Sequence, residues 1–564
     1  MSATNPESER ELHSSNEPDL KPYSSSKSSE SSHTEEEVEG FTTGATRTQT
    51  NASDSSALSR TISRVYTQST NFETPLPSMG GGRSTYPAKI PNEEEYEVQF
   101  DSDDDPLNPL NWSFRRKLVV GAACVWPTTV LSWGSSIYGN ATTEIKHIYH
   151  VGTPVAILGV SLYVIGFATG PIIFGPMSEI YGRKIPMLIS SILFTAFTFW
   201  CATADHFYHI MLYRFFAAAL GAAPLVVAAA ALADMLRTDV RGIGITLFSL
   251  CVIAGPMIAP VVGGYIANSY LGYRWVFYIT GIMGASGILC VIFFLEETYH
   301  PLILCNKARE LRERTGNNFI YAAHERVRPD FNTIAKKVLV LPVKMLFVEP
   351  TLMSLSLYHG FIYGILYLCL EAIPLIFTEK YHWHGGNIML PYLGMFIGAV
   401  LGNMTSIFVF EPLFKKTLAK SGKAVLPEAR LPLMILGSII FPIGIFMLCW
   451  TGNYHVHWIA PVIGCALIGF GMNSLFLPIF NYIIDTYLFL AASALAGNTF
   501  LRSSMGASFP IFATAMFQNL GIEWAGTLLG CLAVLLLPIP FLFYKFGAKI
   551  RRASKYAVDL DNKE

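Results

Sequence analysis

Charged residues are scarce in this 564-residue chain: 14% of it is Asp, Glu, Lys or Arg, while 51% is hydrophobic. A soluble chain of this length would fold as several domains with charged, water-facing surfaces, and the composition excludes that class. Nucleotide-binding and catalytic motifs are also missing. The stretch "MGGGRS" at 79–84 lacks the Lys-Ser/Thr ending of a phosphate-binding loop, which excludes direct use of ATP, and no nucleophile–base arrangement indicates an enzyme.

Disulfide and metal-binding patterns are absent as well. Eight of the nine cysteines lie inside hydrophobic runs and the ninth, Cys305, lies in a polar segment, so we expect reduced thiols. The histidine pairs in "HWH" and "HVH" are not accompanied by cysteine and have few acids near them. We therefore expect no metal site.

Long hydrophobic runs are what the chain has instead. Each is about 20 residues long, the length that crosses a ~30 Å hydrocarbon layer. Each must be helical, because lipid offers the backbone no hydrogen-bond partner. We therefore predict an all-α membrane protein with twelve transmembrane helices. The predicted spans are residues 118–140, 154–174, 185–204, 207–232, 243–266, 275–295, 351–378, 388–410, 432–451, 457–484, 489–513 and 524–546.

Polar segments divide these spans into two halves of six. Residues 1–110 are predicted to form a disordered tail, because residues 1–105 carry 20 acidic and 8 basic residues, are rich in Ser and Thr, and lack an apolar period. Within this tail, Ser63 lies between two arginines and is a candidate kinase target. The other predicted domains are a six-helix bundle at 111–295, a central loop at 296–350, a second bundle at 351–546 and a tail at 547–564.

The basic residues predict the orientation of the chain. They concentrate in alternate connections, such as 115–117, 183–184 and 307–344, whereas the connections between them carry few. By the positive-inside rule, both termini and the central loop are therefore cytoplasmic.

Three charged residues lie deep inside predicted spans, where a charge is costly: Arg214, Glu371 and Arg502. Tyr363, Tyr367 and Glu371 stand at i, i+4 and i+8, which predicts one helix face. Two aromatic rings and an acid suit an organic cation. A buried carboxyl group also takes up a proton readily, so H⁺ and a cation could compete for one site. The alternative is a permanent ion pair of Glu371 with Arg502 or Arg214, with tyrosines that only pack.

The connection "GPMSEIYGRK" at 175–184 packs glycines, an acid and two basic residues into one turn. Gly175 and Gly182 allow a tight turn and close helix approach, and the four-residue spacing of Glu179 and Arg183 predicts an ion pair. Together with Lys184, the pattern resembles the loop signature of the major facilitator superfamily, with Glu in place of the commoner Asp. The resemblance implies a cytoplasmic latch for the outward-open state.

Other stretches resemble the fungal twelve-span drug/proton antiporters of that superfamily. In "AGPMIAPVVGGYI", the fifth-span packing motif is matched by Gly255, Pro260, Gly263 and Gly264, Ala259 replaces one glycine, and Pro256 adds a second kink. Arg214 matches the buried arginine of the fourth span. Five further stretches bring the resemblance to about residues 101–556: "DPLNPLNWSFRRK" (105–117), "RWVFYITGI" (274–282), "ETYHP" (297–301), "PEARLP" (427–432) and "GNTFLRSSMGASFPIF" (497–512).

The resemblance further implies that spans 1, 4, 7 and 10 line a central path. Candidate ligand contacts on spans 1 and 10 are then Trp133, Asn140, Asn473 and Asn481. Asp234 and Asp485 lie near the cytoplasmic ends of spans 4 and 10, where we expect them to form gate pairs with loop arginines such as Arg241.

The function implied by the resemblance is proton-coupled antiport in the fungal plasma membrane, exporting drugs, polyamines or toxic metabolites by alternating access. Glu371 would take up the proton and release a ligand held against Tyr363 and Tyr367, and Arg214 would tune that acid. The expected partners are a small-molecule substrate, protons and membrane lipid. We expect a monomer that binds no nucleic acid and needs no cofactor, since the proton gradient would drive it.

Two alternatives stay open at this point. A proton-coupled importer or facilitator of cationic nutrients would share the fold, and its uptake would depend on external pH. A non-transporting membrane sensor would signal through the long tail, so deleting residues 1–100 would remove its signalling.

Overall fold

The computed structural model describes residues 96–326, 340–421, 427–452, 455–487, 490–552 and 554–557. The predictions made for residues 1–95, including Ser63, lie outside these ranges.

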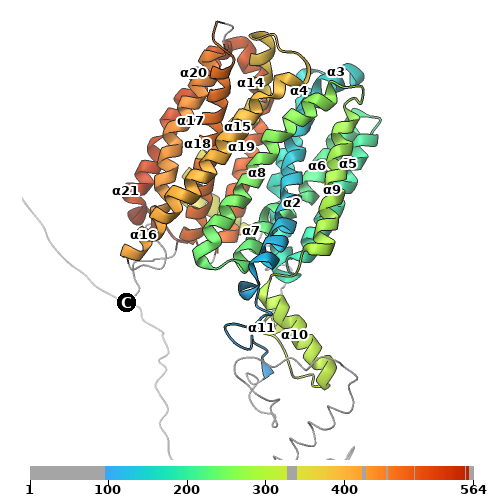
Figure 1. Ribbon diagram of the computed structural model, residues 1–564, viewed down its shortest axis with the longest axis vertical. Helices are drawn as coiled ribbons and strands as arrows, with labels where there is room; N and C mark the ends of the chain where they lie inside the picture. The colour runs from blue at the N-terminus through green and yellow to red at the C-terminus, as the bar shows by residue number, and fades with distance from the viewer. Residues whose placement is uncertain are drawn as a thin grey trace, which may run out of the picture. The chain divides into compact units, whose positions relative to one another are not determined.

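The first half of the chain forms the helices α2 to α9 (Figure 1). Each predicted span corresponds to a helix, but the fourth is broken at Ala222, just before Pro224, which has no backbone N–H to donate. The elements are α2 (Phe114–Ile137), η3 (Tyr138–Ala141), α3 (Thr142–Tyr149), α4 (Thr153–Ile180), α5 (Lys184–Thr203), α6 (Phe207–Gly221), α7 (Ala223–Met235), α8 (Thr238–Ala267) and α9 (Arg274–Phe294).

The second half forms the helices α14 to α21. Its last predicted span is broken at Leu537, next to Pro538, so that two helices replace one. The elements are α14 (Pro350–Glu379), η5 (Gly385–Met389), α15 (Pro391–Thr405), η6 (Ser406–Phe410), α16 (Glu411–Ser421), η7 (Pro427–Arg430), α17 (Leu431–Thr451), α18 (Ile459–Tyr487), α19 (Ala491–Leu520), α20 (Ile522–Leu536) and α21 (Pro538–Arg552).

Eleven helical stretches of the described chain are long and apolar enough to cross a membrane. The remaining predicted span, the eleventh in chain order, is α19, which has 30 residues but is less apolar because it carries Arg502 and many small polar residues. This helix packs against α14 of its own half and α4 of the other half, so its polar residues meet protein. The predicted class, an all-α membrane protein of twelve spans, is confirmed.

The segment between the halves folds against the end of the predicted tail. α10 (His300–Thr315) and α11 (Ala323–Arg326) extend beyond one end of the bundle, which we call the α10 end (Figure 1). Tyr96 and Val98 exchange backbone hydrogen bonds with Tyr321. The buried ammonium group of Lys307 lies 2.7 Å from a carboxylate oxygen of Asp101. Residues 96–110, which we had assigned to the disordered tail, therefore belong to a folded unit with α10.

A second ion pair closes this unit. The Arg312 Nη2 and Glu325 Oε1 atoms are 2.7 Å apart. The hydrogen bonds from the guanidinium group lower the pKa of the Glu325 carboxyl. The pair joins α11 to the end of α10. Further along the chain, α13 (Leu341–Val348) directly precedes α14.

Close helix approach holds the second half together. α15 packs on α18 at Gly398 and Gly469, where an added Cβ atom would overlap the backbone carbonyls of Ala466 and Met395. Small residues at such positions let helix backbones touch in a membrane, where the hydrophobic effect does not drive association. The two halves meet through α4 with α19 and α8 with α15.

We predict that Gly398→Ala destabilises the protein, because neither backbone can move aside without separating α15 from α18. Overpacking of this kind costs about 1–3 kcal/mol. The midpoint of thermal unfolding of the detergent-purified protein should fall. Gly139→Ala is the matched control, since nothing lies within 4 Å of its Cβ position, and equal midpoints for both variants would contradict the packing account.

Candidate functional site

A cavity of about 1750 Å³, including the space open to solvent, lies between the two halves. Its walls come from α4, α7 and α8 of the first half and from α18 and α19 of the second. The wall residues cluster at the helix ends near α10, such as Ala233 at the end of α7 and Ala491 at the start of α19. The cavity is therefore open toward the α10 end.

Most of the cavity wall is apolar, and its charged residues are few. Phe248, Phe476 and Phe480 contribute aromatic rings, and the charged wall residues are Glu179, Arg241 and Arg502. Glu179 and Arg241 lie at the mouth, close to the ends of α4 and α8, whereas Arg502 lies in the interior of α19.

Arg502 is 5% exposed and forms the inner end of the cavity. Its guanidinium carbon lies 4.6 Å from the ring centre of Tyr363 and 5.0 Å from that of Phe476. Its Nε atom has no hydrogen-bond partner, and within the described ranges no carboxylate lies within 4.0 Å of the guanidinium group. The proposed ion pair with Glu371 is not formed.

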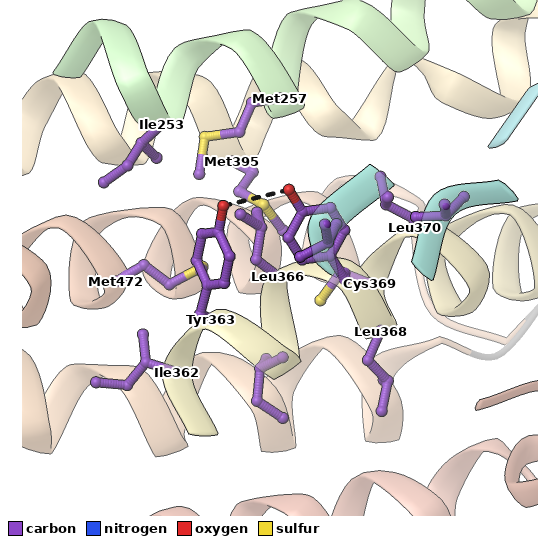
Figure 2. Close-up of a cluster of buried hydrophobic side chains, with 14 of the residues drawn as sticks. Ile253, Met257, Ile362, Tyr363, Leu366, Leu368, Cys369, Leu370, Met395 and Met472 are labelled. Atoms are coloured by element: carbon purple, nitrogen blue, oxygen red, sulfur yellow. Dashed lines mark hydrogen bonds between the residues drawn. The ribbon is translucent and has the colours of Figure 1, made fainter. Parts of the chain in front are cut away.

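A layer of side chains closes the path beyond Arg502. The Tyr363 and Tyr367 hydroxyls are 3.3 Å apart, and the Tyr367 hydroxyl donates to Ser135 of α2 across the interface between the halves, at 3.0 Å. Figure 2 shows the Tyr363 hydroxyl directed toward Met257 and Met395. Nearer the opposite end, Tyr265 donates to Asn387 at 2.7 Å and joins α8 to η5. The cavity is thus closed on the side away from α10.

Glu371 lies further along α14 than the two tyrosines and does not line the cavity. It is half-buried and lines a separate pocket of about 600 Å³ with Pro374, Thr378 and Glu379 of α14 and Thr514 of α19. Neither Tyr363 nor Tyr367 lines this pocket, so the structure gives no support to direct competition of H⁺ and ligand at one site formed with Glu371.

Arg214 is held away from the cavity by backbone carbonyls. Its Nε donates to Gly159 at 2.7 Å and its Nη2 to Gly134 at 3.2 Å. The guanidinium group also lies over the rings of Tyr138 and Tyr163. An added Cβ atom at either glycine would overlap one of these rings, so the glycines make the arginine site possible.

The polar candidates of spans 1 and 10 do not line the cavity. Trp133 is 8% exposed, and its indole N–H has no partner among the described residues. Asn473 faces α15 with both amide atoms unpaired, and Asn481 is also buried. The residues of α18 that do line the cavity include Phe476 and Phe480. Asn140 lies instead beside Gly263 and Gly264 of α8.

The fifth-span motif serves helix contact. An added Cβ atom at Gly255 would lie 2.7 Å from the backbone nitrogen of Trp133, so the glycine lets α8 touch α2. Pro256 and Pro260 lie inside α8, which continues through both as one helix.

At the α10 end, the ion pairing of the 175–184 turn differs from the prediction. Arg183 pairs with Asp234 at 3.0 Å, and no ion pair between Arg183 and Glu179 is found in the described part of the chain. Arg183 stands at the start of α5, after the turn, where its side chain reaches the end of α7 rather than the exposed Glu179. Asp234 therefore does not pair with Arg241, which donates to the Ala233 carbonyl at 3.2 Å.

The turn itself is held by Glu297, which the sequence did not single out as a site residue. Its carboxylate accepts hydrogen bonds from the backbone N–H groups of Arg183, Lys184, Thr298 and Tyr299. Gly182 has a φ of 81°, and an added Cβ atom there would overlap the Glu297 carboxylate. Gly175 has nothing within 4 Å of its Cβ position, so close helix approach does not explain that glycine here.

The second half repeats this arrangement. Asp485 near the end of α18 pairs with Arg430, at the end of η7 just before α17, at 2.7 Å, as Asp234 pairs with Arg183. Glu349, just before α14, accepts backbone hydrogen bonds from Lys555 and Tyr556 near the C-terminus. Acidic residues next to "TYHP" and "PTLM" were the only sequence signal for these two acceptors.

Comparisons with known proteins agree with this architecture. The family model described as Major Facilitator Superfamily matches residues 128–510. The chain is 46% identical to the "Major facilitator superfamily multidrug transporter FLU1" of Candida albicans over 99% of this chain and 91% of that protein. It is 45% identical to the "Multidrug transporter TPO1_2" of Candida glabrata, over 91% of this chain and 90% of that protein.

A solved structure shares the fold at low sequence identity. It is described as a partially occluded inward open conformation of the xylose transporter XylE from E. coli. The TM-score is 0.54 at 16% identity, over 76% of this chain and 99% of that one. The match concerns the fold alone.

We predict that Glu297→Ala destabilises the α10 end, because four backbone N–H groups lose their acceptor. Leaving a buried donor unsatisfied costs about 1–3 kcal/mol. The thermal midpoint in detergent should fall clearly. The neighbouring Glu296→Ala is the control: Glu296 pairs with Arg116 on the surface, with both side chains more than 40% exposed, and such pairs contribute about 0–1 kcal/mol. A larger loss for Glu296→Ala would overturn the assignment.

Proposed function

Because this chain belongs to the major facilitator superfamily and is a multi-pass membrane protein, we propose that it exports small organic molecules by alternating access, driven by the proton gradient. The observation that carries the proposal is the cavity, which is open at the α10 end and closed beyond Arg502. Its apolar, aromatic wall suits amphipathic compounds. The names of the relatives, which are multidrug transporters, support the substrate class.

The orientation that we propose makes this the loading state of an exporter. The basic residues of α10 and of the turn at 183–184 favour the α10 end as cytoplasmic. Both termini would then be cytoplasmic, and the membrane would be the plasma membrane. A ligand would enter from the cytoplasm or the inner leaflet and reach Arg502 and Phe476. It would leave once the Tyr363–Tyr367–Ser135 layer opens.

Proton coupling is proposed to run through Glu371 without contact between proton and ligand. Glu371 lies eight residues from the far end of α14, about 12 Å along the helix axis, in a pocket that borders α19. Apolar surroundings favour the protonated carboxyl. Uptake of a proton from the outside would change how α14 and α19 meet, and Arg502 of the cavity lies on α19. Coupling would therefore act through helix packing.

The Arg–Asp ion pairs at the α10 end would stiffen each half, and Glu179 would contribute to the cytoplasmic latch. Arg183–Asp234 and Arg430–Asp485 each join a connection to a helix end within one half. They stiffen the two halves for movement as rigid bodies. Glu179, exposed at the cavity mouth, is free to gain a partner from the other half when the mouth closes.

Glu371→Gln should abolish proton-driven accumulation, because the amide cannot take up or release the proton. Inside-out plasma-membrane vesicles with an acidic lumen would be loaded with a labelled azole, with and without a protonophore. Accumulation should be protonophore-sensitive in the wild type and lost in Glu371→Gln. Glu379→Gln, in the same pocket but at the exposed end of α14, is the control and should accumulate normally.

Two results would contradict this proposal in different ways. Normal accumulation by Glu371→Gln would remove Glu371 from the coupling. Protonophore-insensitive equilibration in the wild type would replace antiport with facilitated diffusion, which is the behaviour of the facilitator alternative.

Tyr367→Phe should weaken the closed layer and lower the share of molecules that are open at the α10 end. The lost hydrogen bond is worth about 0.5–1.5 kcal/mol, or roughly a two- to tenfold shift in the equilibrium. The measurement is the rate at which an impermeant maleimide labels Ala230→Cys, in the cavity wall, in inside-out vesicles. Tyr381→Phe, whose hydroxyl bonds carbonyls within the second half, should leave the rate unchanged; an equal rate in Tyr367→Phe would argue against the gate.

A further inference from the structure

We propose that Arg502 is the subsite for a negatively charged group of the transported ligand, so that aromatic organic anions are a substrate class of this protein. The inference rests on the proposed function and specifies its substrate. It differs from the cation expected from the sequence, because the acid that was to bind that cation, Glu371, lies in another pocket.

The first argument is the missing partner of a buried charge. A guanidinium group carries five N–H donors, and burying it without acceptors is costly. At Arg502, the contacts in the described structure are the faces of two aromatic rings, and the buried Nε is left without an acceptor. A carboxylate in the cavity would supply the acceptors in the two-pronged geometry that arginine favours.

Arg214 shows what a structural arginine looks like in the same fold. It is buried to the same degree, 3% exposed against 5%. It too lies over two aromatic rings, but two backbone carbonyls accept its N–H groups. The difference between the two arginines is therefore the acceptor. At Arg214 the protein backbone provides the hydrogen-bond acceptors. At Arg502 the cavity lies where an acceptor would be.

The second argument is the distribution of charge along the cavity. Its acidic wall residue, Glu179, and Arg241 both lie at the mouth, so they offset each other there. The inner end keeps the positive charge of Arg502 in apolar surroundings, where electrostatic attraction is strong. An anion would be drawn inward past a neutral mouth, whereas a cation would meet repulsion at the inner end.

The third argument is the aromatic surface next to Arg502. Phe476 and Phe480 are stacked with ring centres 6.5 Å apart, and both line the cavity. A ligand with a flat ring could lie against them while its carboxylate reaches Arg502. The cavity is large enough for a compound of several rings.

The test compares two dyes with a common ring system and opposite charge, fluorescein and rhodamine 123. Binding to purified full-length protein is measured by fluorescence anisotropy, for the wild type, Arg502→Gln, Arg502→Lys and Arg116→Gln, whose arginine lies on the surface in a pair with Glu296. We expect Arg502→Gln to weaken fluorescein at least about tenfold, the loss typical of a hydrogen-bonded charge, and to leave rhodamine 123 unchanged or tighter. Arg502→Lys should restore part of the fluorescein affinity, and Arg116→Gln should retain all of it.

Other outcomes would overturn the subsite. Equal losses for both dyes in Arg502→Gln would make Arg502 a structural residue. If Arg502→Gln does not fold, the wild type decides: it must bind fluorescein more tightly than fluorescein methyl ester, and equal affinities reject the proposal. Transport in the vesicles distinguishes failure of the anion subsite from failure of the proposed export. If the azole is pumped and fluorescein is not, only the anion subsite is rejected. If neither the azole nor either dye moves, export itself is rejected.

Discussion

Hydrocarbon accepts no hydrogen bond, and this constraint governs where the backbone and the arginines of the molecule find their partners. Backbone groups are satisfied by long helices, and Arg214 is satisfied by carbonyls that glycines expose. Arg183 and Arg430 are satisfied by acids at the helix ends. Arg502 is the buried arginine for which the described protein offers only ring faces. A polar group that the fold leaves unpaired at the edge of a cavity is where a ligand is expected to complete the structure.

Each half has an Arg–Asp ion pair at the α10 end, formed by different residues in the two halves. In each half, a short connection carries an arginine that reaches an aspartate at or near the end of the second membrane span after it. The aspartate is Asp234 in one half and Asp485 in the other. These contacts stay within a half, whereas Tyr367 with Ser135 and Tyr265 with Asn387 cross between halves. Strong local pairs and weaker cross-contacts together favour movement of rigid halves against each other.

Much of the fold could be predicted from the sequence, because runs of about 20 apolar residues have one stable solution in a bilayer. Arg502 could also be singled out, since a charge in such a run is rare. The predictions that failed concern which residues contact each other in the folded protein, and the sequence pattern does not determine those contacts. Glu371 was grouped with Tyr363 and Tyr367 from helical spacing alone, which cannot show that the neighbouring helices leave Glu371 in a pocket of its own. Arg183 was paired with the nearest acid in sequence, Glu179, although the packing of α7 brings Asp234 to it.

The unpaired charge of Arg502 has an electrical consequence. It lies eleven residues into α19, about 17 Å from the start of that helix, and so near the middle of the membrane. In the alternating access that we propose, the aqueous boundary would move past this charge, and the charge would cross much of the voltage drop while the side chain stays in place. A full crossing is worth about 2.3 kcal/mol per 100 mV. With the α10 end in the cytoplasm, an interior-negative potential holds the empty carrier in its cytoplasm-facing state, and a bound anion removes that bias.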